Sequence, residues 1–157
     1  EKWRESGYRI ADQRVDVRFS NFYEGNIAER SLEITEIDML FYHLANNCAL
    51  YSEDRVLTIQ VAELPDGENL RWAFSNRVSE PQYEAVEQLK RQKISLFEHG
   101  TSTAERAGFG LGLLGATIVH AYGLEGLFEA REQGYFGSTF VDDHFVLWFH
   151  WPRVDIS

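Results

Sequence analysis

The sequence predicts an α+β domain, a two-layer α/β sandwich in which a mixed or antiparallel sheet carries its helices on one face. Three observations lead to this fold class. Several short segments alternate between apolar and polar residues, as half-buried strands do. Longer segments repeat their apolar residues every three or four positions, as amphipathic helices do. The signals follow the order strand, helix, two strands, helix, loop, helix and then strands.

The first half of the chain predicts a strand, a long helix and a hairpin. Arg14–Asn21 alternates in polarity and is expected to be a strand. Glu33–Ser52 is the strongest helix signal, and Thr35 can cap its start. Arg55–Leu64 and Asn69–Asn76 alternate again on either side of a Pro-Asp-Gly turn, so we expect them to form a hairpin.

The second half predicts two helices and closing strands. Ser79–Lys93 is expected to be a helix with proline in its first turn, followed by a polar, glycine-containing loop over Leu96–Gly110. A second helix is expected over Leu111–Tyr122, ended by the glycine that follows. Glu125–Gln133 is expected to contain a short strand, and Thr139–Trp151 a closing strand or strand pair.

Composition and charge limit the function classes. We expect residues 1–157 to form a single domain with a real core. The net charge of −10 argues against nonspecific nucleic-acid binding. The sequence has no apolar run long enough to span a membrane and no signal peptide, so we expect no membrane contact by this chain. Because it begins with Glu1 rather than Met, we expect a fragment of a longer protein or a processed chain.

Three segments carry candidate functional residues. Glycine recurs at every second position before a helix in Gly108–Leu113, where backbone amides could bind phosphate, although such turns also occur for steric reasons. His43 and Asn47 share one helix face, either as ordinary solvent-facing residues or as a site where the Asn47 carbonyl oxygen binds Mg²⁺. Asn76 stands where a hydrophobic strand ends in a polar turn, which is common in any fold.

The order and spacing of these segments resemble the ATP-binding domain of the GHKL superfamily, and within it the catalytic domain of sensor histidine kinases. The resemblance covers about Val15 to Pro152 and implies the Bergerat-type sandwich, with an ATP lid loop from about Pro81 to Gly108. The matching motifs are an N box (HLANNCALYS, His43–Ser52), an F box (LFEHGTST, Leu96–Thr103), a second glycine box (GFGLGLLGATIVHAYG, Gly108–Gly123), a glycine turn (GYFGSTF, Gly134–Phe140) and a closing strand with proline (WFHWP, Trp148–Pro152).

The first glycine box departs from the family pattern. The family usually has Asp-x-Gly-x-Gly there, whereas this chain has Asn76 at the Asp position and Val78 at a glycine position. Peptide-sensing quorum kinases of the family also carry Asn there. A neutral amide is a weaker acceptor than a carboxylate, so we expect nucleotide binding to weaken by about 1–2 kcal/mol, or up to about thirtyfold.

The resemblance implies a site for ATP with Mg²⁺. Asn47 would be the magnesium ligand and His43 would assist proton transfer, so these are the implied catalytic residues. The residues implied to bind the nucleotide are Asn47, Tyr51, Asn76, Val78, Arg106, Gly108, Gly110, Leu111, Gly112, Leu113 and Thr139.

The resemblance also implies a protein-histidine kinase, which transfers the γ-phosphoryl group of ATP to a histidine on a separate dimerisation domain of the same protein. That acceptor domain and a response regulator are the implied partners, without nucleic acid, and the full-length protein is expected to be a homodimer. A cytoplasmic location is expected, including as the cytoplasmic part of a membrane-bound receptor.

Other interpretations stay open. A degenerate GHKL domain could bind nucleotide weakly or not at all and act as a regulatory or protein-interaction module. An anti-sigma-factor-type serine kinase shares the ATP site. ATP-driven clamps such as gyrase are less favoured, because His43 stands where they use an acidic base. An α+β domain that binds no nucleotide is a further alternative.

Overall fold

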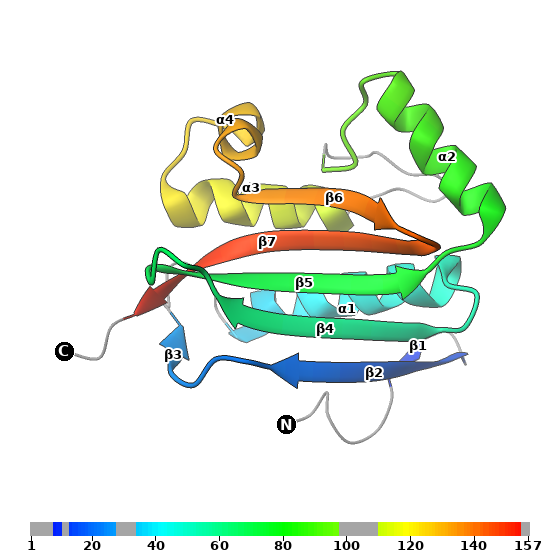
Figure 1. Ribbon diagram of the computed structural model, residues 1–157, viewed down its shortest axis with the longest axis horizontal. Helices are drawn as coiled ribbons and strands as arrows, with labels where there is room; N and C mark the ends of the chain where they lie inside the picture. The colour runs from blue at the N-terminus through cyan, green and yellow to red at the C-terminus, as the bar shows by residue number, and fades with distance from the viewer. Residues whose placement is uncertain (1–7, 11–12, 28–33, 98–109, 155–157) are drawn as a thin grey trace.

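The main feature of the fold is a sheet whose strands come from most of the length of the chain (Figure 1). The computed structural model describes residues 8–10, 13–27, 34–97 and 110–154, and within these residues seven strands form one mixed sheet. The centre of the sheet has the spatial order β2 (Gln13–Asn21), β4 (Val56–Glu63), β5 (Asn69–Arg77), β7 (His144–Val154) and β6 (Phe136–Val141), while β1 (Tyr8–Ile10) pairs with β2 and β3 (Asn26–Ile27) pairs with the end of β7.

The strand directions follow from the connections. β2 and β4 run parallel, and the helix α1 (Ile34–Tyr51) lies between them in the chain, as the crossover of a parallel pair requires. β4 and β5 form an antiparallel hairpin, and β6 and β7 form another. The predicted hairpin, the predicted closing strand pair and the mixed α+β fold class are therefore confirmed.

Helices α1 and α3 (Gly110–Tyr122) pack against one face of the sheet, here called the helix face (Figure 1). Alternate strand residues point to this face, since side chains alternate along a strand. The opposite face is called the open face. The core between the two layers contains Val15, Leu57, Ile59, Phe74, Leu147, Phe149 and Trp151 from the strands and Leu44, Ala45, Cys48, Leu114 and Ile118 from the helices.

The helix α2 (Glu80–Arg91) follows β5 and projects away from the sheet (Figure 1). Its Val86 is buried, and its Tyr83 ring packs 4.5 Å from the ring of Phe140 on β6. The Lys90 ammonium lies 4.7 Å from the centre of the same Phe140 ring. α2 therefore touches the sheet at the β6 edge, through the contacts of Tyr83 and Lys90 with Phe140. None of the helices in the described ranges is long and apolar enough to cross a membrane.

The prediction of a short strand within Glu125–Gln133 is wrong, because this segment forms the helix α4 (Leu127–Glu132). Two features explain the helix. Ala130 has no exposed surface and belongs to the core. The Glu129 carboxylate accepts hydrogen bonds from the Glu125 amide at 2.7 Å and from the Gln133 side chain at 2.8 Å. Contacts four residues apart stabilise a helix and have no counterpart in a strand.

Arg71, Trp148 and His150 form a cluster on the open face. The Arg71 guanidinium donates hydrogen bonds to Nε2 of His150 at 3.1 and 3.0 Å and lies 4.8 Å from the centre of the Trp148 ring. Gly137 of β6 leaves room for this indole, since a Cβ there would lie 2.6 Å from its Cζ2 atom. Burial and the positive charge of Arg71 lower the pKa of His150 from 6.5 to about 4.

We expect the free energy of unfolding to fall as the pH is lowered from 6.5 to about 4. In this window the unfolded chain takes up a proton at His150 that the folded chain does not bind, so acid favours unfolding. Urea unfolding at several pH values measures the effect. The comparison protein is His150→Gln, and equal pH dependence in the two proteins would contradict the assignment.

Cys48 of α1 is the only cysteine of the sequence, and 1% of its surface is exposed. Burial raises the pKa of its thiol from 9.0 to about 11, although a hydrogen bond with Ser52 opposes the shift. The thiol of the folded protein is therefore protonated at neutral pH.

We expect Cys48 to react with a thiol reagent far more slowly in the folded protein than in the urea-unfolded chain. The thiolate is the reactive species, and a rise of two pKa units alone reduces its fraction by about a hundredfold. Ellman's reagent at neutral pH measures both rates. Equal rates would mean that the thiol is exposed in the folded protein, against its position in the core.

Candidate functional site

The end of α1 and the end of β5 meet in a set of backbone contacts, here called the junction. Ser52 pairs with Val78 in an antiparallel bridge, and the Glu53 amide donates a hydrogen bond to the Arg77 carbonyl at 3.1 Å. The junction therefore brings the last turn of α1 beside the start of α2, which follows Val78 directly.

The start of α3 points toward the same end of the sheet. At the far end of the helix, the Tyr122 hydroxyl donates a hydrogen bond to the Asn69 side chain at 2.7 Å, which places the end of α3 beside the start of β5. α3 has 13 residues, so it extends for about 20 Å along the sheet toward the end of β5 (Figure 1). Its first turn thus faces the region of the junction.

Three predicted site residues of α1, His43, Asn47 and Tyr51, lie on successive turns and are all half-buried. Their four-residue spacing places them along one side of the helix. Within the described ranges, neither the Asn47 amide nor the His43 imidazole makes a hydrogen bond; the His43 ring packs 5.8 Å from the ring of Tyr42. Within the described residues, no hydrogen bond therefore occupies the Asn47 carbonyl oxygen.

At the position of the expected first glycine box, strand β5 ends, and hydrogen bonds and side-chain contacts hold this strand end in place. β5 continues one residue beyond the predicted end, to Arg77. The Arg77 guanidinium contacts Asp143 at 2.6 Å and Glu53 at 3.4 Å, and the Val78 amide donates to the Asp143 carbonyl at 3.0 Å. Val78 is 7% exposed, so it offers little surface to a ligand. Asn76 is half-buried, and its Nδ2 lies 3.4 Å from the Arg77 carbonyl.

The described part of the second glycine box lies inside a helix. Gly110, predicted to end a loop, is the first residue of α3, so Gly110 and Gly112 both belong to its first turn, and Gly112 is buried. Leu111 and Leu113 are half-buried. The first amides of a helix lack partners within the helix and are suited to bind anions. Two predicted site residues, Arg106 and Gly108, lie outside the described residues.

Thr139 is not brought to this end of the helix face. Phe136 and Phe140 of β6 pack against Phe97 and Tyr83 on the helix face, and Thr139 alternates with them. Its side chain therefore points to the open face, where it is exposed. The motif comparison aligned the residue correctly with a strand but could not fix which face it occupies.

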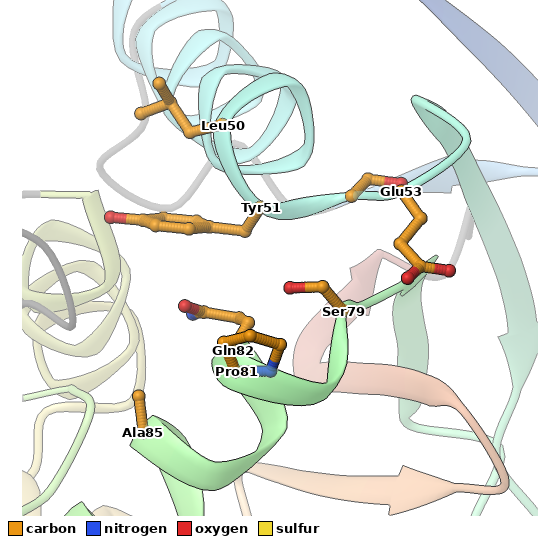
Figure 2. A pocket seen from close by; sticks show the side chains of 8 residues that line it. Leu50, Tyr51, Glu53, Ser79, Pro81, Gln82 and Ala85 are labelled. Atoms are coloured by element: carbon orange, nitrogen blue, oxygen red, sulfur yellow. The ribbon is translucent and has the colours of Figure 1, made fainter.

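A pocket of about 370 Å³ lies next to the junction, between the end of α1 and the start of α2 (Figure 2). In Figure 2 the Tyr51 ring lies over the first turn of α2, and the Ser79 hydroxyl and Gln82 point toward the same space. Ser79 occupies the N-cap position of α2, yet its side chain makes no capping hydrogen bond. We call this space the α1–α2 pocket; its lining residues are Leu50, Tyr51, Ser52, Glu53, Ser79, Pro81, Gln82 and Ala85.

Sequence reasoning found only Tyr51 among these lining residues. The α2 side of the pocket was missed because Ser79 and Pro81 were interpreted as helix-start signals, which they also are. A usable signal was present. The predicted helix follows the predicted strand end at Asn76 after only two residues, so its first turn must lie near the candidate residues of β5.

Comparison with known proteins identifies the fold. No family model matches the chain, and no curated protein matches it. The nucleotide-free catalytic domain of the histidine kinase ThkA aligns with a TM-score of 0.57 at 16% identity, over 90% of this chain and 82% of that one. Full-length ShkA in complex with AMPPNP aligns with a TM-score of 0.55 at 13% identity, over 91% of this chain and 27% of that one.

A histidine kinase from Burkholderia phymatum aligns with a TM-score of 0.51 at 11% identity, over 90% of this chain and 60% of that one. These identities are too low to transfer an activity, but the alignments extend over nearly the whole chain. The resemblance found in the motifs is confirmed at the level of the fold: the chain has the fold of the ATP-binding catalytic domains of histidine kinases.

Proposed function

We propose that this chain is the ATP-binding catalytic domain of a sensor histidine kinase. The observation that carries the proposal is the position of the Asn47 amide. The Asn47 amide lacks a hydrogen-bond partner in the described ranges, and it lies on the same side of α1 as Tyr51. The first turn of α3 points toward this end of the fold. An amide oxygen that accepts no hydrogen bond from the described residues, together with a helix start at the same end of this fold, suits a magnesium–phosphate group.

Asn47 would hold Mg²⁺ through its side-chain oxygen. The described residues contain no group of three or more His, Cys, Asp or Glu that could hold a metal alone. Mg²⁺ usually takes only one or two protein ligands together with substrate phosphates, so a site of this kind does not require such a group. When bound, Mg²⁺ neutralises charge on the phosphoryl oxygens. The first amides of α3, at Gly110 and Leu111, would donate hydrogen bonds to the phosphate chain. His43, one turn before Asn47, would hold the proton of the attacking group.

The acceptor of the phosphoryl group would be a histidine on a dimerisation domain of the same protein, with a response regulator as the next partner and a homodimer as the full assembly. We place the domain on the cytoplasmic side, where ATP is available. The AMPPNP complex of full-length ShkA supports nucleotide binding by this fold, and this chain spans 27% of that protein.

A second candidate function is a degenerate domain that acts through protein contacts. The junction favours it, because Arg77 and Val78 are held by hydrogen bonds and an ion pair where the family has a flexible glycine box. A rigid strand end could leave the fold intact while nucleotide binding is lost.

Calorimetric titration with Mg-AMPPNP separates the two functions. For the kinase domain we expect measurable binding that Asn47→Ala weakens by about tenfold, as the loss of a contact to a charged group does. The matched control is Asn46→Ala, which removes the same side chain from the neighbouring position, about 100° around the same helix. Wild-type protein that binds no nucleotide at millimolar concentration, while folded, would leave only the second function.

We expect nucleotide binding to depend on Mg²⁺ through Asn47. Removal of the metal with EDTA weakens AMPPNP binding in the wild type by about fivefold to tenfold, because the Asn47 oxygen loses its link to the phosphates. The Asn47→Ala variant shows a smaller metal dependence. An equal metal effect in the variant and the wild type would exclude Asn47 as the ligand.

A further inference from the structure

We propose that the open face of the sheet is a docking surface for an acidic protein partner, and that Arg71, stacked on Trp148, binds a carboxylate of that partner. The surface lies apart from the candidate nucleotide site. Arg71 is five residues from Asn76 along β5, or about 17 Å, and its side chain points to the face opposite the helices. The proposal therefore does not depend on nucleotide binding.

The open face differs from the rest of the chain in charge. The chain contains 25 Asp and Glu residues among 157 and has a net charge of −10. None of the residues that β4, β5, β6 and β7 direct to the open face is acidic. β5 directs Arg71 and Arg77 to this face, and Arg77 is already paired with Asp143 and Glu53. The charge of Arg71 makes the face complementary to an acidic surface.

No carboxylate among the described residues pairs with Arg71. Its guanidinium instead donates to Nε2 of His150 at 3.1 and 3.0 Å. Burial and the charge of Arg71 lower the pKa of this imidazole to about 4, so the imidazole is neutral at pH 7. The Asp66 carboxylate, in the turn before β5, accepts hydrogen bonds from the Asn69 side chain at 3.0 Å and the Glu68 amide at 2.9 Å. A neutral acceptor leaves the positive charge of Arg71 uncompensated.

The Arg71 guanidinium is held in position before any partner binds. It lies 4.8 Å from the centre of the Trp148 ring, and Gly137 gives that ring room to lie close to β6. The bonds to His150 use the Nε and Nη2 groups, so the two N–H groups of Nη1 can donate to a carboxylate. Because a planar guanidinium is preorganised, it loses little conformational freedom for each hydrogen bond that it forms.

The shape of this face favours a protein over a small anion. Ala62 is paired across the strands with Arg71, and Ala73 is paired with Trp148. Short side chains therefore flank both residues, and the surface around them is shallow. Small-molecule sites are concave, whereas protein interfaces are often dominated by Trp and Arg side chains. An acidic segment of a protein is thus the partner that fits this surface.

Titration of ¹⁵N-labelled protein with an octa-glutamate peptide tests the proposal at 0.15 M salt, where long-range repulsion is screened. We expect saturable shifts of the amide signals of Arg71, Trp148 and Gly137. The Arg71→Gln variant is expected to bind at least about fivefold more weakly, because a hydrogen bond between two charged groups is lost. Arg71→Lys keeps the charge without the planar fork, so its affinity is expected to lie between those of the other two proteins.

The matched control is Arg18→Gln, which removes the same charge from the same face of the sheet. Arg18 already pairs with Asp16 at 3.5 Å, so this variant should bind the peptide like the wild type. Urea unfolding verifies that each variant folds. Sodium acetate at the same carboxylate concentration should shift these signals much less, because a small anion lacks the neighbouring contacts of a protein segment.

An equal loss of binding in Arg18→Gln, no peptide binding at millimolar concentration, or equal shifts with acetate would each overturn the proposal. Tighter binding of duplex DNA would assign the face to nucleic acid instead. Sedimentation as a dimer that Arg71→Gln converts to a monomer would assign it to a second copy of this chain. The proposed function stands in all of these cases, because it concerns the other face of the sheet.

Discussion

The pairing of Ser52 with Val78 fixes the end of α1 against the end of β5, and the candidate site depends on this contact. It sets where Tyr51 lies, because Tyr51 is the last residue of α1. It also sets where α2 begins, because Ser79 follows Val78. The ion pairs of Arg77 with Asp143 and Glu53 surround the junction but are solvent-exposed, so they contribute little to stability and mainly restrict the backbone direction.

The contacts at the junction distinguish this chain from the histidine-kinase motif pattern, which its sequence otherwise resembles. A flexible glycine box can open and close over a ligand, whereas a bonded strand end cannot do so without breaking the Val78 bridge and the hydrogen bond to Asp143. The polar groups that a nucleotide would need are nevertheless present elsewhere, on α1 and at the start of α3. The net charge of −10 also disfavours a triphosphate at long range. Local donors, above all the first amides of α3 and a metal on Asn47, would have to offset it.

Most of the fold could be predicted because its signals are local and periodic. The alternation of Arg14–Asn21 and the helical repeat of Glu33–Ser52 each bury one face against the core, and β2 and α1 follow them closely. The strand prediction for the segment that forms α4 was wrong because the segment has few apolar residues. The burial of Ala130 is decided by packing against the rest of the core. No local pattern contains that information.

The site was less predictable than the fold. The spacing of His43, Asn47 and Tyr51 on one helix could be read directly, since it follows from helical geometry. The face occupied by Thr139 depends on strand register, and one residue of difference moves a side chain to the other face. The α1–α2 pocket depends on the junction, which joins residues far apart in the sequence. Its α2 side therefore becomes visible only in three dimensions.

The most direct test of a nucleotide site at this end of the fold is the change in backbone amide signals of ¹⁵N-labelled protein on titration with Mg-AMPPNP. We expect the largest shifts at Asn47, Tyr51, Ser79 and Leu111, and little change at Arg71 and Trp148 on the open face. Saturable shifts confined to the open face, or no shifts at millimolar nucleotide, would contradict the account.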